Sequence, residues 1–324
     1  MAVLLTASAL APNAAAAHKK SHTLLDGVGD AVGALAGTGK TTKGAKIVPP
    51  KNGTWVGTYQ EATGPRLVKQ NRVLDVEDLI GRTQDVDHIY EAWNAPFPGW
   101  RETWDSLNGR VPFVSWAKAS TSAINSGRYD GMIKQRALDV KAAGYPMLLE
   151  WFWEMDGARN KHVAGSPAQF IAAWKRIHDI FERNGADNVS WVWCPNAWGF
   201  ATGDAQKYYP GGNYVDWICA NGYNWAPGRK GDQWRSFQWT FQPFYDWGSA
   251  QNKPLMIGEF GVQERKPGEK AQWLKDAATT LKNDMTNIKA VVYFDVKKKY
   301  NWTLDSSSSS ANAFKALART LQGG

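Results

Sequence analysis

The sequence has few of the residues that most often hold metals or cross-link a chain. Its 324 residues include two cysteines and five histidines, and the histidines form no cluster with cysteine. This scarcity excludes a disulfide-rich scaffold and argues against a structural zinc site. Beyond residue 17, no stretch reaches the ~18 uninterrupted apolar residues of a membrane span. We therefore expect no membrane insertion, no metal and no cofactor.

Neither sign of charge dominates the chain. Lys and Arg number 38 against 30 Asp and Glu, which gives a formal net charge of +8. The basic residues are scattered rather than gathered in stripes interleaved with aromatics, so nucleic acid is not an expected partner. We expect a monomer.

Tryptophan is the residue in excess. The chain has 18, all between Trp55 and Trp302, and 43% of its residues are hydrophobic. A chain of this length and composition can bury one large core, and some of the indoles must belong to it. So many indoles also suit a sugar-binding cleft, where the flat C–H faces of sugar rings stack on aromatic rings.

The N-terminal region differs in composition from the rest. Residues 1–17 (MAVLLTASALAPNAAAA) form an apolar run with an Ala-x-Ala end, which predicts a signal peptide truncated at its start and hence a secreted, extracellular protein. The alternative is a disordered Ala-rich end. Residues 18–50 predict a flexible linker. Within the linker, GTGKTT has Ala34 where a phosphate-binding loop needs glycine.

From residue 51 to 324, short apolar runs alternate with amphipathic stretches. This alternation predicts one α/β catalytic domain, a (β/α)8 TIM barrel. Readable caps predict helices at 128–144, 167–183, 268–282 and 311–321, with a loop at 306–310. The eight candidate strands begin at Thr54, His88, Val111, Pro146, Val189, Val215, Pro254 and Ala290.

The two cysteines fall on neighbouring predicted strands. An oxidising compartment could join Cys194 to Cys219, but sequence does not fix the distance between them. Two buried thiols acting as small apolar side chains are the alternative.

Two glutamates close predicted strands, where the catalytic groups of a TIM barrel lie. Glu154 ends the fourth strand and Glu259 the seventh, each among aromatic or apolar neighbours. An unpaired carboxylate is costly to bury there unless it is used. A strand-end Glu taken alone is more often a structural hydrogen-bond acceptor. Two of them supply the pair of carboxyl groups that glycoside cleavage needs.

Four sequence blocks resemble glycoside hydrolase family 26, a clan A barrel family of endo-β-mannanases with some lichenases and β-1,3-xylanases. Glu154-Met155-Asp156-Gly157 resembles the acid/base signature, and residues 256–261 (MIGEFG) resemble the nucleophile strand. Residues 191–196 (WVWCPN) and 208–217 (YYPGGNYVDW) are similar to the fifth and sixth strand segments, and Gly222-Tyr223-Asn224 follows in its expected place.

The resemblance implies a retaining double displacement. Glu259 would attack to form a glycosyl-enzyme, while Glu154 would donate a proton and then activate water. The resemblance also implies that Tyr223 lies beside Glu259 and holds it by a hydrogen bond.

The chain departs from the family pattern around the acid/base. Trp153 stands where the family has His, and Glu150 where it has Arg. Glu150 shares a strand face with Glu154, so it could raise the pKa of the acid or could pair structurally with an Arg. Residues 158–162 (ARNKH) replace the family's aromatic run, and the sugar platform comes from Tyr293 or from Trp302.

Further candidates for binding sugar lie at strand ends. Asn196 and Asn224 could bind hydroxyls or cap loops. Glu91 could bind a hydroxyl or pair with an Arg. The remaining candidates are indoles expected to stack on sugar rings, namely Trp93, Trp198 and Trp225.

The sequence thus predicts a secreted endo-β-glycanase with a polysaccharide substrate, β-1,4-mannan first. A lichenase-like β-glucanase or a hydrolase of another exopolysaccharide is the alternative on the same fold. A non-catalytic polysaccharide-binding protein is the alternative of a different class. The missing His and Arg favour that alternative, and the presence of both Glu154 and Glu259 disfavours it.

Overall fold

The computed structural model describes residues 45–228 and 231–323, which belong to one compact unit, Ala34–Gly324. The predicted signal peptide, the GTGKTT segment and most of the predicted linker lie outside the described residues. No helix in the described ranges is long and apolar enough to cross a membrane.

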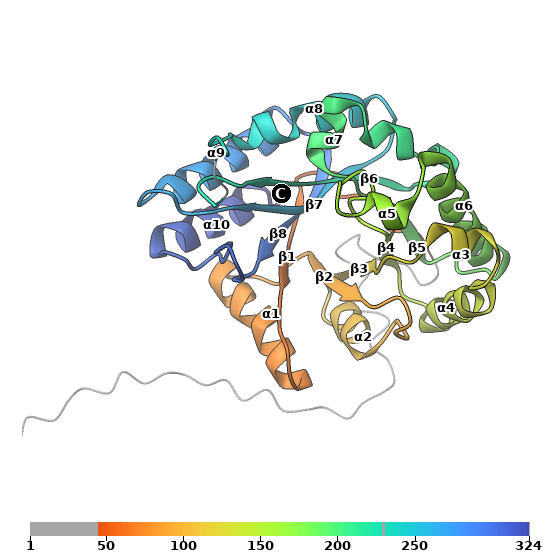
Figure 1. The fold of residues 1–324 in the computed structure, drawn as a ribbon. Helices are drawn as coiled ribbons and strands as arrows, with labels where there is room; N and C mark the ends of the chain where they lie inside the picture. The colour runs from red at the N-terminus through yellow and green to blue at the C-terminus, as the bar shows by residue number, and fades with distance from the viewer. Residues whose placement is uncertain (1–44, 229–230, 324) are drawn as a thin grey trace, which may run out of the picture. The chain divides into compact units, whose positions relative to one another are not determined.

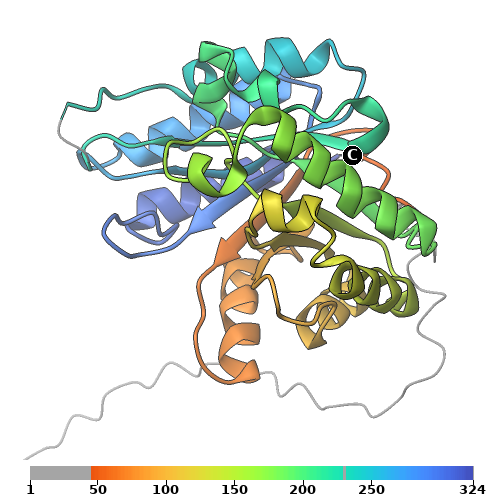
Figure 2. The same cartoon turned by 45° about the vertical axis from the view of Figure 1, so that its right-hand side comes forward.

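Eight parallel strands close into a barrel in the order in which they occur along the chain, and helices surround them (Figures 1 and 2). The predicted (β/α)8 barrel is confirmed. Its strands are rich in Val, Ile and aromatics because both of their faces are buried. The strands are β1 (Trp55–Gln60), β2 (Val86–Glu91), β3 (Val111–Trp116), β4 (Met147–Trp151), β5 (Val189–Trp193), β6 (Trp217–Asn224), β7 (Leu255–Val262) and β8 (Ile288–Asp295).

The helices form the outer layer of the barrel. Their bounds are α1 (Arg66–Ile80), α2 (Trp100–Leu107), α3 (Thr121–Asn125), α4 (Asp130–Ala143), α5 (Lys161–Ala164), α6 (Pro167–Arg183), α7 (Ala197–Thr202), α8 (Phe237–Ser249), α9 (Glu269–Asn283) and α10 (Ser308–Thr320), with short 3-10 turns η2 (Ala205–Tyr208) and η3 (Gly212–Tyr214).

Helix ends follow from their capping residues. At the start of α6, the Ser166 hydroxyl accepts the Gln169 N–H at 3.3 Å, and the Gln169 side chain accepts the Ser166 N–H at 2.8 Å. The last helix begins earlier than predicted. Ser307 caps it by accepting the Ser310 N–H at 3.2 Å, so part of the expected serine loop is helical.

The fourth strand is shorter than predicted, and the turn that follows it positions Glu154. β4 stops at Trp151, because Phe152 and Glu154 have left-handed backbones with φ of 61° and 54°. Such a conformation is uncommon for residues with a side chain and usually marks a functional turn. Glu154 therefore lies in a tight turn beyond the strand and not at its last position.

The N-terminal end of the barrel is closed by apolar side chains. Ile47 lies in a buried cluster with inward-facing residues such as Trp55 and Trp217. Its N–H donates to the Ser190 hydroxyl at 2.7 Å, and the neighbouring Lys46 pairs with Asp216 at 3.1 Å. The end of the segment predicted as linker is therefore bound to the barrel.

A disulfide joins Cys194, directly after β5, to Cys219 in β6. Both residues are fully buried in the cluster that fills the barrel. Gly258 on the adjacent strand leaves room for the bridge, since a Cβ there would lie 2.6 Å and 2.9 Å from the two sulfur atoms. Of the two sequence alternatives, the structure has the disulfide.

Removing the bridge should destabilise the barrel without changing its fold. The cysteines are 25 residues apart, and cross-linking a loop of that length stabilises a protein by about 3 kcal/mol. We expect the double variant Cys194→Ala/Cys219→Ala to lose about that much free energy of unfolding in guanidinium titration. An unchanged unfolding midpoint would contradict this assignment.

Candidate active site

Two carboxyl groups line one cavity at the C-terminal ends of the strands. Glu154 comes from the turn after β4, and Glu259 lies within β7. The cavity has a volume of about 1680 Å³ and is walled by the loops after β4, β5, β6 and β8. The structure thus brings together two residues that are far apart in the sequence.

Backbone contacts fix the Glu154 turn. The Glu154 N–H donates to the Cys194 carbonyl at 2.8 Å, and its own carbonyl accepts the Asn160 side-chain amide at 2.8 Å. The second bond explains one residue of the altered 158–162 loop, because Asn160 is nearly buried and closes the turn. The carboxyl of Glu154 is therefore carried on a rigid loop.

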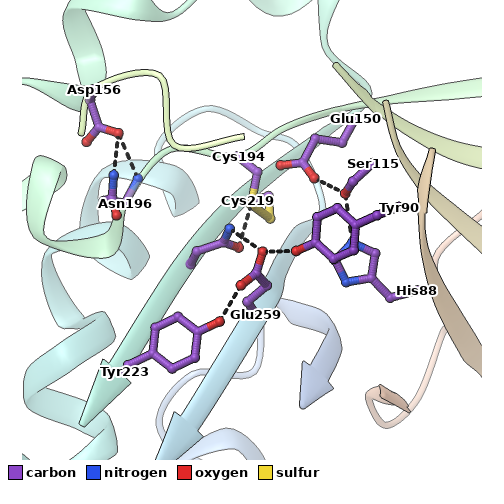
Figure 3. Close-up of a disulfide and its surroundings, with 11 residues drawn as sticks. His88, Tyr90, Ser115, Glu150, Asp156, Cys194, Asn196, Cys219, Tyr223 and Glu259 are labelled. Carbon is purple, nitrogen blue, oxygen red and sulfur yellow. Dashed lines mark hydrogen bonds between the residues drawn. A yellow bond between two sulfur atoms is a disulfide. The ribbon is translucent and has the colours of Figure 1, made fainter. Parts of the chain in front are cut away.

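Three donors surround the carboxyl of Glu259 (Figure 3). The Tyr90 hydroxyl donates to Oε1 and the Tyr223 hydroxyl to Oε2, while Asn221 donates from Nδ2 to Oε1 at 3.1 Å. The Tyr223 bond is the one implied by the family resemblance. Donors on both oxygens stabilise the ionised form and hold the carboxylate in one orientation.

The surroundings of Glu154 and Glu259 shift the pKa values of the two carboxyl groups differently. Burial, and next the negative charge of Glu259, raise the pKa of Glu154 to about 8. Burial also raises the pKa of Glu259, but the hydrogen bonds from Tyr223 and Tyr90 act in the opposite direction. When one proton is shared by this pair, these contacts favour its placement on Glu154.

Glu150 on β4 is a third buried carboxyl. Its Oε2 accepts a hydrogen bond from the Ser115 hydroxyl, which lies 2.7 Å from His88 Nε2 (Figure 3). Burial raises its pKa well above the usual value, opposed by the Ser115 hydrogen bond and reinforced by the charges of the other two glutamates. Of the two alternatives for Glu150, the pairing with an Arg is not seen, since no ion pair among the described residues involves it.

Trp153 faces the cavity at the position where the family has His. The Lys118 ammonium lies 4.2 Å from the centroid of its ring, and the Tyr90 ring contacts it edge-on. Burial lowers the pKa of Lys118, while the charge of Glu154 acts against this shift. The residue next to Glu154 is therefore an indole with the Lys118 ammonium packed against its ring.

Asn196 lines the cavity next to the Glu154 loop. Its backbone N–H and its Nδ2 both donate to Asp156 Oδ1, at 3.0 Å and 2.9 Å. Asp156 thus uses one oxygen to link the loop after Glu154 to the start of α7 (Figure 3).

Aromatic rings form the wall on the β6 and β8 side. Trp302 contacts Tyr223 and Trp225, with ring centroids 5.0 Å and 5.2 Å apart. Phe294 from β8 completes this wall, and Trp198 lines the opposite part of the cavity. The predicted stacking residues Trp198, Trp225 and Trp302 therefore all face the cavity.

Two predicted stacking residues belong to the core instead. Trp93 is buried and stacks on Trp116, with ring centroids 4.3 Å apart. Tyr293 is fully buried on the outer face of β8, and its hydroxyl donates to the Trp302 carbonyl at 2.7 Å. Alternation along the strand turns Tyr293 away from the cavity and places the next residue, Phe294, in it.

Two predicted polar candidates also lie outside the main cavity. Asn224 is fully buried and holds the backbone of Arg235, donating to its carbonyl at 2.9 Å, so it is a loop-capping amide. Glu91 lines a second cavity of about 310 Å³ on the β1–β2 side. Burial, and next the charge of Glu102, raise the pKa of Glu91 to about 7. None of the described ion pairs includes Glu91.

Sequence reasoning missed Tyr90, Asn221 and Lys118. Tyr90 could have been found, because the alternation that buries His88 also points Tyr90 into the barrel. Asn221 directly precedes the Gly222-Tyr223-Asn224 block but is not part of the segment that resembles the family. No local sequence signal indicates that Lys118 faces the acids.

The described residues contain no group of three or more His, Cys, Asp or Glu side chains that could hold a metal ion.

Comparison with known proteins agrees with the resemblance. Residues 132–244 match glycosyl hydrolase family 26. Endoglucanase H of Acetivibrio thermocellus is 31% identical over 277 residues, which cover 82% of this chain and 30% of that protein. Mannan endo-1,4-beta-mannosidase A and B of Caldalkalibacillus mannanilyticus is 28% identical over 121 residues, or 37% of this chain and 21% of that protein. The chain thus spans under a third of the length of these relatives.

Solved structures agree on the fold. The mannanase man26 of Bacillus subtilis superposes with a TM-score of 0.57 at 15% identity, covering 81% of this chain and 85% of that one. GH26C of a Muricauda species gives a TM-score of 0.63 at 14% identity, covering 83% and 86%. These structures show the fold, and the sequence matches show that the chain belongs to glycosyl hydrolase family 26.

Proposed function

We propose that this protein is a retaining β-glycan hydrolase in which Glu259 is the nucleophile and Glu154 the acid/base. The observation that carries the proposal is the pair of buried carboxyl groups in one cavity, of which Glu259 alone is held by three side-chain donors. A carboxylate held in this way is preorganised to attack, and its protonated neighbour is suited to donate.

The reaction takes two steps. In the first, a Glu259 oxygen attacks the anomeric carbon while the glycosidic C–O bond breaks and the Glu154 proton passes to the leaving oxygen. In the second, water attacks the same carbon, its proton passes to Glu154, and Glu259 is released as a carboxylate. The charge of Glu259 disappears in the first step, so the pKa of Glu154 falls and it becomes a base.

We propose a β-linked glucan or mannan as the substrate. The cavity of about 1680 Å³ exceeds the ~300–1,000 Å³ of ordinary small-molecule pockets and is open to a chain. The sequence motifs favour β-1,4-mannan. The match to a protein named endoglucanase, over 82% of this chain, supports testing a β-glucan beside it.

Export is part of the proposal. The predicted signal peptide supports it, and so does the Cys194–Cys219 disulfide, because such bonds persist in oxidising compartments. A polymeric substrate would also be met outside the cell.

A non-catalytic glycan-binding protein is the second candidate. Trp153 and Glu150 in place of His and Arg favour it. Against it stand the three donors on Glu259, which a binding protein would not need. Reducing-sugar release from mannan, lichenan, curdlan and β-1,3-xylan distinguishes the two candidates: turnover supports the enzyme, and binding without turnover supports the alternative.

Replacing either proposed catalytic carboxyl should abolish turnover. We expect Glu154→Gln and Glu259→Ala each to lower kcat by several powers of ten, because the proposed attack and proton transfer each depend on that carboxyl. The matched control is Glu182→Gln on α6, away from the cavity, and should behave as wild type. A near-normal rate in either cavity variant would dismiss the assignment.

The pH dependence should report both acids. Glu154 must be protonated to donate, so kcat/KM should fall as the pH rises through about 8. Glu259 must be ionised to attack, and its raised pKa should place the acidic limb above that of an exposed carboxyl. Initial rates on a soluble glycan across the pH range test this. A rate that keeps rising above about pH 9 would count against Glu154 as the acid.

The Tyr223 hydroxyl should matter for rate more than for stability. Tyr223→Phe removes one donor from the Glu259 carboxylate, and hydrogen bonds to charged groups contribute about 1.5–3 kcal/mol. We therefore expect kcat to fall about 10- to 100-fold. Tyr145→Phe is the control, because that hydroxyl contacts Thr103 outside the cavity. Equal rates in the two variants would refute this role.

A further inference from the structure

Two indoles at the rim of the cavity are exposed to solvent. Trp198 is 61% exposed and Trp239 44%, and they are the aromatic members among the exposed large apolar side chains of the described residues. Their rings stack nearly parallel, with centroids 5.8 Å apart and an interplanar angle of 23°. Both line the cavity that holds Glu154 and Glu259. Clustered apolar surface at a cavity rim usually marks a binding site.

Trp198 lies close in the chain to the contact that holds the loop after Glu154. It lies in the first turn of α7, directly after the segment in which Asp156 holds Asn196. The helix can approach this closely because residue 199 is glycine: a Cβ there would overlap the Asp156 carboxylate. The position of the indole is therefore set relative to Glu154.

Trp239 is connected through neighbouring residues to β6, the strand that carries Tyr223. It lies in the first turn of α8, where the Ser236 hydroxyl accepts its N–H at 3.0 Å. The preceding Arg235 is held by Asn224, which follows Tyr223 on β6, and its carbonyl also accepts the Trp273 indole N–H at 2.8 Å. The backbone that carries each indole is thus held by contacts within the protein, which lowers the entropic cost of binding a ligand there.

The two stacked indoles, Trp198 and Trp239, differ in their contacts and exposure. The Arg235 guanidinium lies 4.0 Å from the centroid of the Trp239 ring, so Trp239 has both a cation and an indole against it. Among the described residues, Trp198 has Trp239 as its ring partner and is the more exposed. Trp198 also lines the cavity.

We propose that Trp198, supported by Trp239 and Arg235, is a distal sugar platform that binds pyranose rings of the glycan chain cleaved between Glu154 and Glu259. This inference rests on the proposed function. The flat C–H faces of an uncharged β-linked chain match the indole surface, and the guanidinium edge can donate to ring hydroxyls. The platform would make affinity depend on chain length.

The experiment measures binding in a variant that does not turn over. In the Glu259→Gln background, isothermal titration compares di- and hexasaccharides of mannan and of mixed-linkage β-glucan. Trp198→Ala should weaken hexasaccharide binding about tenfold more than disaccharide binding, the scale of one lost aromatic stacking contact. Trp239→Ala should give a smaller, length-dependent loss. Leu107→Ala, which removes another exposed apolar side chain outside the cavity lining, is the control and should change neither affinity.

The outcomes separate the two proposals. If Trp198→Ala leaves hexasaccharide affinity unchanged, or weakens both ligands equally, the platform is refuted while turnover by the wild type still supports the hydrolase. If the wild type cleaves none of the glycans but binding depends on Trp198 and on chain length, the platform stands and the hydrolase falls. If neither ligand series binds, both proposals are overturned.

Discussion

Two carboxyl groups buried in one cavity cannot both carry a charge at low energetic cost, and the arrangement of this site follows from that constraint. Like charges in a poorly solvated environment raise each other's pKa, so a single proton is retained by the pair. Phenol and amide donors converge on Glu259, whereas Glu154 lies in a turn with its backbone, more than its carboxyl, engaged. In the proposed mechanism, this asymmetry of donors selects Glu259 to attack and Glu154 to donate the proton.

The rest of the barrel serves to hold these groups at fixed positions. Glu259 and its phenolic donors stand on strands, the most rigid elements available, while Glu154 is held by a left-handed turn bonded to Cys194. The disulfide from Cys194 to Cys219 then connects this turn to β6, the strand that carries Asn221 and Tyr223. The Glu154 turn is thus connected to β6 through one backbone hydrogen bond and the disulfide.

Much of this architecture could be predicted from sequence, because strand periodicity and strand-end acids are local patterns. These patterns predict the eight strands and single out Glu154 and Glu259, whereas the place of Tyr223 beside Glu259 comes from the family resemblance. The side chains that were misassigned depend on register. Tyr293 and Phe294 differ by one position, and only the pairing of β8 shows which one faces the cavity. Asn221 reaches Glu259 across a register shift in the β6–β7 pairing, for which the sequence has no local signal. For Glu150 the sequence left open a charge effect on Glu154 or a pairing with an Arg, and its partner Ser115 comes from another strand.

The central claim is that Glu259 bonds covalently to the sugar during turnover. A fluorosugar that forms the glycosyl-enzyme but releases it slowly tests this directly, by mass spectrometry of the peptides of the labelled protein. The account predicts one added sugar, located on the peptide that contains Glu259 and absent in Glu259→Ala. A label on a different carboxylate, or cleavage with inversion at the anomeric carbon, would contradict it.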